Sequence, residues 1–142
     1  MNPRGFQKHY STDEIFTADP RKITLMLYEG AIRFLKQAKD MAQANDVEAR
    51  QANIDRASAI LYELLQCLDF EKGGEIAEHL RDLYIFIIRR LVDAGTRNDP
   101  APIAECIPIL EVIHEGWELA MFKPAAELTT QKPSQVSYSF QI

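Results

Sequence analysis

Residues 68–91, LDFEKGGEIAEHLRDLYIFIIRRL, decide the fold of this chain. They predict the end of one helix, a turn at Gly73-Gly74 and a second helix, because glycine readily adopts the left-handed backbone that ends a helix. At about 100° per residue, apolar side chains cover more than half of the circumference of that second helix. Burial within a bundle requires only one apolar face, so the surplus predicts contact with another apolar helix.

The apolar side chains of this helix fall into two groups. The first shares one face and is expected in the bundle core: Ile76, Leu80, Leu83, Tyr84, Ile87 and Leu91. The second widens that face on one flank, where we expect a partner to bind: Ala77, Ile85, Ile88 and Val92. Val112 and Leu119, which lie outside the apolar face of the last helix, are interpreted as scattered surface residues.

The composition is that of an acidic globular domain. The chain has 142 residues, 46% of them hydrophobic, and a formal net charge of −5. This charge argues against nucleic-acid binding, which normally requires a basic surface. The sequence has neither an apolar run of about 18 residues nor a signal-peptide core after Met1, so we expect a cytoplasmic protein without membrane insertion. Cys67 and Cys106 are expected to be free, buried thiols.

Helical periodicity predicts four helices, over residues 20–44, 47–70, 75–94 and 101–121. Aspartate and proline at the helix starts, and Gly95 after the third helix, set these boundaries. Short connections between long helices place consecutive helices antiparallel. The predicted fold class is therefore all-α, an antiparallel up-down four-helix bundle. Its expected core includes Val47 in the second helix and Trp117 in the fourth.

The segments on either side of the bundle are predicted to be a short N-terminal helical arm and a flexible C-terminal tail. The predicted division is an arm over residues 1–18, the bundle over 19–122 and the tail over 123–142. Ser11 and Glu14 have the spacing of a capping box, which predicts a brief helix after them. Within the fourth helix, Pro108 predicts either a kink or a helix that begins properly only near that proline.

A carboxylate metal site is the main catalytic alternative for a four-helix bundle. Such a site requires two Glu-x-x-His pairs and further inward-pointing glutamates. The sequence has one pair, Glu111 and His114, while Glu29 and Glu63 are predicted to point away from the core. We therefore expect no metal, no cofactor and no enzymatic activity, and we interpret His114 as a hydrogen-bonded residue at the core edge. A metal- or ligand-binding enzyme and a self-associating structural bundle remain the alternatives.

The run LMLYEGAIRFLKQAK over residues 25–39 resembles the first-helix signature of the FliS-type flagellar export chaperones. Residues 68–91 are similar to that family's most typical segment, and the likeness extends over about residues 10–120. The resemblance implies a cytoplasmic bundle that binds the disordered C-terminal segment of flagellin, keeps it unpolymerised and delivers it to the flagellar type III export gate. It also implies that the N-terminal arm, with Tyr10, covers part of the client groove.

The apolar surplus and the resemblance together give a predicted partner-binding set. An amphipathic client helix needs a long apolar groove, and the widened face of the third helix suits one. The predicted partners are flagellin and an export gate component, and the protein is expected to be a monomer or a weak homodimer. The predicted partner-binding residues are Tyr10, Ile15, Ile60, Leu65, Tyr84, Ile85, Ile88 and Val92.

Overall fold

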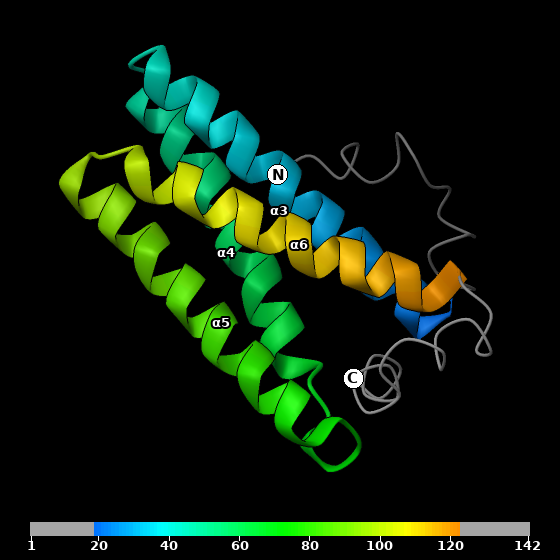
Figure 1. The fold of residues 1–142 in the computed structure, drawn as a ribbon. Coiled ribbons are helices and arrows are strands. Elements are labelled where there is room, and N and C mark those ends of the chain that lie inside the picture. The colour runs from blue at the N-terminus through cyan, green and yellow to red at the C-terminus, as the bar shows by residue number, and fades with distance from the viewer. Residues whose placement is uncertain (1–18, 123–142) are drawn as a thin grey trace.

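A computed structural model describes residues 19–122 as four helices: α3 (Pro20–Gln43), α4 (Val47–Gln66), α5 (Phe70–Arg97) and α6 (Ala101–Phe122). Consecutive helices run in opposite directions, and the α3–α4 and α5–α6 turns lie at the same end of the bundle (Figure 1). This architecture confirms the predicted all-α four-helix bundle. The predicted arm, with its short helix, and the predicted tail lie outside the described residues.

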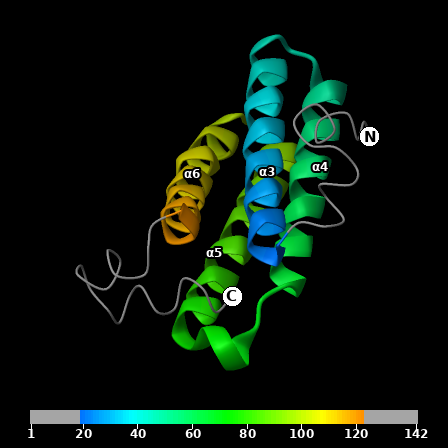
Figure 2. The same cartoon turned by 90° about the vertical axis from the view of Figure 1, so that its right-hand side faces the viewer.

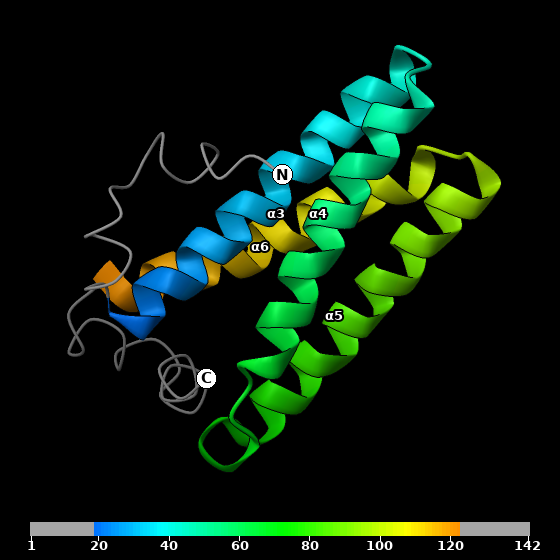
Figure 3. The same cartoon turned by 180° about the vertical axis from the view of Figure 1, so that it is seen from behind.

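The helix α3 lies between α4 and α6, as Figure 2 shows, and packs against both. The helix α5 contacts the same two helices from the other side of the core. Seen from behind in Figure 3, the end of α5 and the start of α6 lie close together at their shared turn, and the two helices separate with distance from it. The side of α5 that faces α6 is therefore less closely packed as the distance from the shared turn increases.

An aspartate caps the start of each of these four helices. A side-chain oxygen of each aspartate accepts a hydrogen bond from a backbone N–H in the first turn, at 2.8–3.0 Å: Asp19, Asp46, Asp69 and Asp99. Such a cap satisfies a donor that the helix itself leaves unpaired. Arg21 also donates to Asp19 through its side chain, and this hydrogen bond lowers the pKa of that carboxyl. The predicted helix starts at Pro20 and Val47 are confirmed.

The predicted helix ends are less accurate. The helix α4 stops at Gln66, not at residue 70, and α5 continues past Gly95 to Arg97. The stop after α5 is Asn98, which adopts a left-handed backbone with φ of 53°. Asparagine tolerates this conformation better than most residues, so it can end a helix as glycine does.

Gly74 keeps part of its predicted role. It has φ of 52° and ψ of −128°, which interrupts the helical backbone inside α5. An L-residue with a side chain is strained at that positive φ, so glycine is required there. The predicted turn is therefore a break after the first turn of α5, and not the boundary between two long helices.

Pro108 does not delay the start of α6. The helix runs from Ala101 through Pro108 to Phe122, so the prediction of a start near Pro108 is wrong. Proline removes the hydrogen bond that its N–H would give to the carbonyl of Ala104. Both Pro108 and Ala104 are exposed, so water can satisfy this carbonyl.

The core lies at the centre of the four helices and confirms most of the predicted apolar faces. Trp117 is buried as predicted, and the largest fully buried side chains are Tyr28, Tyr84, Leu35, Leu61, Ile87, Leu91, Ile103, Leu110 and Cys106. Three predicted burials are wrong. Val47 is exposed because it is the first residue of α4, at the end of the bundle. Leu83 is at the exposed edge of α5, and Cys67 is exposed in the turn after α4.

Candidate functional site

A hydrogen-bonded aromatic cluster joins α3, α5 and α6 in the centre of the core. The indole N–H of Trp117 donates to the hydroxyl of Tyr28 at 3.2 Å, and that hydroxyl also shares a hydrogen bond with Tyr84. Burial raises the pKa of Tyr28 to about 12 and raises the pKa of Tyr84 as well. Both hydroxyls therefore remain protonated at neutral pH, and their hydrogen bonds link three helices in the core.

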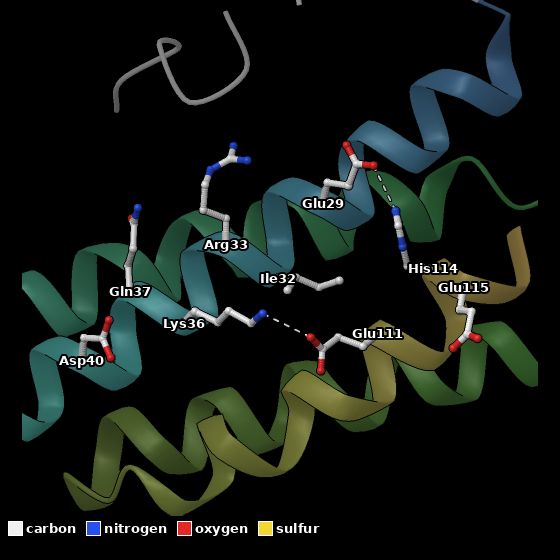
Figure 4. A pocket seen from close by; sticks show the side chains of 9 residues that line it. All are labelled: Glu29, Ile32, Arg33, Lys36, Gln37, Asp40, Glu111, His114 and Glu115. Carbon is white, nitrogen blue, oxygen red and sulfur yellow. Dashed lines mark hydrogen bonds and ion pairs between the residues drawn. The ribbon is translucent and has the colours of Figure 1, made fainter. Parts of the chain in front are cut away.

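The α3–α6 side of the bundle is closed by polar bridges. His114 lies 3.0 Å from Glu29, and Lys36 lies 3.1 Å from Glu111, each pair joining α6 to α3. Figure 4 shows both pairs at the rim of a hollow of about 550 Å³, with Ile32 between them. The interpretation of His114 as a hydrogen-bonded core-edge residue is confirmed. Glu29 was expected to point away from the core, whereas it is half-buried between the two helices and reaches His114.

The described residues show neither a cluster of metal ligands nor a cysteine with a lowered pKa. Within residues 19–122, no group of three or more His, Cys, Asp or Glu side chains is placed to hold a metal ion. Burial, with a smaller contribution from the charge of Glu105, raises the pKa of the Cys106 thiol to about 12. Cys67 is exposed overall, but partial desolvation of its thiol also raises its pKa, with the charge of Glu63 adding to the shift. A nucleophilic cysteine requires the opposite shift.

The α5–α6 side carries one charged contact followed by exposed apolar residues. Arg90 on α5 bonds Glu105 on α6 at 2.8 Å, near the shared turn. Helix positions seven residues apart lie on the same side of a helix. Leu83 therefore shares a side of α5 with Arg90, and Val112 shares a side of α6 with Glu105.

Phe86 lies between Leu83 and Arg90 on the same side of α5, and Leu119 lies seven residues beyond Val112 on α6. Phe86 is 41% exposed, Leu119 is 46% exposed and Val112 is 68% exposed. Counted along each helix from the α5–α6 turn, Leu83, Val112 and Leu119 lie beyond the Arg90–Glu105 contact, and the two helices separate away from that turn (Figure 3). We call Leu83, Phe86, Val112 and Leu119 the apolar ridges. Clustered exposed apolar side chains of this kind are typical of a surface that another chain covers.

The structure divides the predicted partner-binding residues into exposed and buried ones. Val92 is exposed, Ile85 and Leu65 are partly buried, and Ile60 and Ile88 are buried where α4 and α5 meet. Tyr84 is buried within the aromatic cluster, so in this conformation it lies below the molecular surface and is not available for direct contact with a partner. Tyr10 and Ile15 lie outside the described residues.

The predicted flank of α5 borders a shallow cavity of about 340 Å³ between α4 and α5. Val92 and Thr96 line it from α5, and Ile54 and Ser58 line it from α4. The helix α5 therefore has exposed apolar side chains on both of its long sides, towards α4 and towards α6.

Sequence reasoning missed the apolar ridges because it treated each helix alone. On its own helix, Val112 is one apolar residue among polar neighbours, which is common on protein surfaces. The signal in the sequence is a pair of heptad steps, from Arg90 back to Leu83 and from Glu105 forward to Val112. The Arg90–Glu105 bond shows that the two steps start from positions that face each other.

None of the helices within the described range has a stretch long and apolar enough to span a membrane. The family model for the flagellar protein FliS matches residues 2–124. A flagellar secretion chaperone FliS of Campylobacter jejuni is 38% identical over 108 residues, covering 76% of this chain and 84% of the relative. The chaperone of the same name from Salmonella typhimurium is 38% identical over 105 residues, covering 73% and 78%. That of Vibrio cholerae is 31% identical over 115 residues, covering 81% and 85%. With a family match over most of its length and relatives at this level of identity, the chain belongs to the FliS family of flagellar proteins.

Proposed function

We propose that this flagellar export chaperone binds the disordered C-terminal segment of flagellin in the cytosol and keeps it from polymerising. It then delivers flagellin to a gate component of the flagellar type III export apparatus. Membership of the FliS family implies a role without enzymatic activity. The observation that carries the proposal is the exposed apolar surface on both long sides of α5.

Two sides of one helix suit a long, flexible client. A disordered segment can wrap a large surface, and its amphipathic helices can bury apolar side chains in grooves of the partner. The client is proposed to contact Ile85 and Val92 on the α4 side of α5 and the apolar ridges on its α6 side. Ile60, Leu65 and Ile88 border the first contact, and Tyr84 supports it from the core.

The N-terminal arm is proposed to regulate access to this surface. In this proposal Tyr10 and Ile15 cover part of the client groove in the free protein and are displaced by flagellin. Deleting residues 1–18 then exposes apolar surface, increases dye binding and leaves client affinity equal or higher. A clear loss of affinity on deletion would contradict this competition and indicate that the arm contacts the client directly.

Titration calorimetry of the full chain with the C-terminal peptide of flagellin tests the proposal. Burial of apolar surface gives binding a negative heat-capacity change, so the binding enthalpy should become more favourable as temperature rises. A peptide of the same composition in scrambled order serves as the control, because it lacks the amphipathic pattern. Absence of binding to the native peptide would refute the proposed client. Sedimentation of the free chain tests the expected monomer or weak homodimer.

A further inference from the structure

Arg50 on α4 is a buried charge at the end of the bundle where the two turns lie together. Its side chain is among the few buried polar ones, with 3% of the residue exposed. An arginine side chain stays protonated in proteins, so its charge is buried with it. Burying a charge is costly unless another charge or several hydrogen bonds compensate for it.

The compensation that Arg50 receives is incomplete. Its Nη1 group donates a hydrogen bond to the side-chain oxygen of Asn98, a neutral acceptor. Its Nε group is buried and has no hydrogen-bond partner, and Arg50 forms no ion pair with any carboxylate in residues 19–122. On the next turn of α4, the buried Oδ1 oxygen of Asn53 is also without a partner. The guanidinium therefore keeps an uncompensated positive charge.

Two aspartates flank this site in the sequence, Asp46 four residues before Arg50 and Asp99 directly after Asn98, and both are engaged elsewhere. Asp46 caps α4 by accepting from the backbone N–H of Ala49, and Asp99 caps α6 by accepting from Ala101. Neither aspartate forms an ion pair with Arg50 among the contacts of the described residues. The two acidic groups thus hold helix ends, and the charge of Arg50 is left for a group that approaches from outside.

Arg50 lines a cavity of about 220 Å³ between the α3–α4 turn and the α5–α6 turn. The other lining residues are Ala42, Asn45, Val47, Asn98 and Pro100. The polar part of this lining combines the guanidinium with two asparagines, both of which have a left-handed backbone. Ala42, Val47 and Pro100 add apolar walls beside the charge. The cavity is large enough for one side-chain-sized group, and its chemistry suits an anion with an aliphatic stem.

We propose that this cavity binds a carboxylate of another polypeptide, supplied by an aspartate, a glutamate or a chain terminus, with Arg50 as its charged partner. The planar guanidinium matches a carboxylate through paired hydrogen bonds, which are stronger than bonds between neutral groups. The apolar walls contact the carbon stem of the acid. The proposal rests on the buried charge and its cavity, and it is independent of flagellin binding at α5.

Nuclear magnetic resonance of the full ¹⁵N-labelled chain tests this site through the Nε–H signal of Arg50. N-acetylglycine is the probe, because it presents a terminal carboxylate on a short stem, and chloride keeps the ionic strength constant. We expect a saturable shift of the Arg50 signal at millimolar probe. No saturable shift would overturn the proposal, whether the cavity holds only water or a carboxylate of the chain itself. Inorganic phosphate, titrated in parallel, should bind more weakly, and clearly tighter binding of phosphate would overturn the carboxylate assignment.

Two variants show whether Arg50 is responsible. Arg50→Lys loses the planar fork, so probe affinity, followed through backbone amides of the two turns, should fall by about tenfold or more. Asn98→Asp supplies an internal carboxylate to Arg50, so it should also lose the probe response while the folded state becomes more resistant to heat. Arg89→Lys replaces an exposed arginine on α5 and is the matched control. An unchanged response in both Arg50→Lys and Asn98→Asp would assign the probe to another site and overturn the proposal.

Discussion

The two long sides of α6 differ in what they offer to the neighbouring helix. Towards α3, the side chains of Glu111, His114 and Trp117 each reach a partner on that helix. Towards α5, the side chain of Glu105 binds Arg90, and the positions that follow it along the helix are apolar and exposed. The α3 side of α6 is therefore held by specific side-chain pairs, whereas the α5 side carries apolar side chains that remain exposed.

This difference separates residues that stabilise the fold from residues that are available to bind a partner. A side chain that is buried and hydrogen-bonded in the isolated chain contributes to folding, and its loss destabilises the protein. An exposed apolar side chain contributes little to folding but gains from contact with a client. The difference between the two sides predicts opposite effects of substitutions on stability and on binding.

The largest expected effect is on the closed side. Trp117→Ala should lower the free energy of unfolding by ~3–5 kcal/mol, because it removes buried area and leaves a cavity. Chemical denaturation monitored by circular dichroism measures this change. Leu119→Ala, two residues later on the exposed side, is the matched control and should change stability little. Equal losses in both variants would remove the distinction between the two sides.

The open side should show its effect in binding. Phe86→Asp and Leu119→Asp should each weaken binding of the flagellin C-terminal peptide by about tenfold or more, because a charge in a dry contact loses its hydration. Calorimetry measures the affinity, and circular dichroism confirms that the helices remain folded. Tyr62→Asp, at an exposed aromatic residue on α4, is the control. Unchanged affinity in both ridge variants would move the client away from the α6 side.

The α4 side of α5 is best tested at an exposed residue. Ile88 is buried, so an aspartate there would destabilise the fold and confuse binding with stability. Val92 is exposed on the same flank, and Val92→Asp should weaken client binding by up to about tenfold with little change in stability. If only the ridge variants weaken binding, the client uses the α6 side of α5 alone.

A smaller effect is expected in the aromatic cluster. Tyr84→Phe removes one hydroxyl from the contact with Tyr28 and should cost about 1 kcal/mol of stability. The pKa of both tyrosines is raised by burial, so the unfolded chain releases these protons first as pH rises. Their contribution to stability is complete below pH ~10 and is lost as pH approaches the raised values. Denaturation at pH 8 to 11 should show a smaller pH-dependent loss in Tyr84→Phe than in the native chain.

The smallest effect is expected at the polar rim of the closed side. Lys36 and Glu111 are both largely exposed, and water screens the attraction between them. Lys36→Ala should therefore change the free energy of unfolding by less than about 1 kcal/mol. Denaturation at low and high salt checks this value, because an exposed ion pair weakens as salt is added. A larger cost that salt does not reduce would show that this pair is coupled to the core.

The sequence predicted the parts of the fold that depend on local signals. Helix starts at Pro20 and Val47 follow from an aspartate cap, which acts within one turn of the chain. The exact stop after α5 was missed because Gly95 can remain helical, whereas Asn98 adopts the left-handed backbone only in this context. The end of α4 was missed because the apolar period continues through Leu68 although the helix stops at Gln66.

The candidate surface was predicted only in part, because it depends on pairs of helices. Periodicity identified the surplus on α5 but not which of its flanks α4 covers, so it did not show that Ile60 and Ile88 are buried. The exposed ridges depend on the angle at which α5 and α6 separate, which no single helix encodes. Arg50 was missed because an arginine in a helix is normally exposed.

Pro108 lies between two ion pairs that hold α6 to different helices. Arg90 holds Glu105 on one side of the proline, and Lys36 holds Glu111 on the other. Because proline lacks a backbone N–H, the helix loses one hydrogen bond at this turn and is less stiff there. Amide hydrogen exchange should therefore be faster around this turn than in the rest of α6.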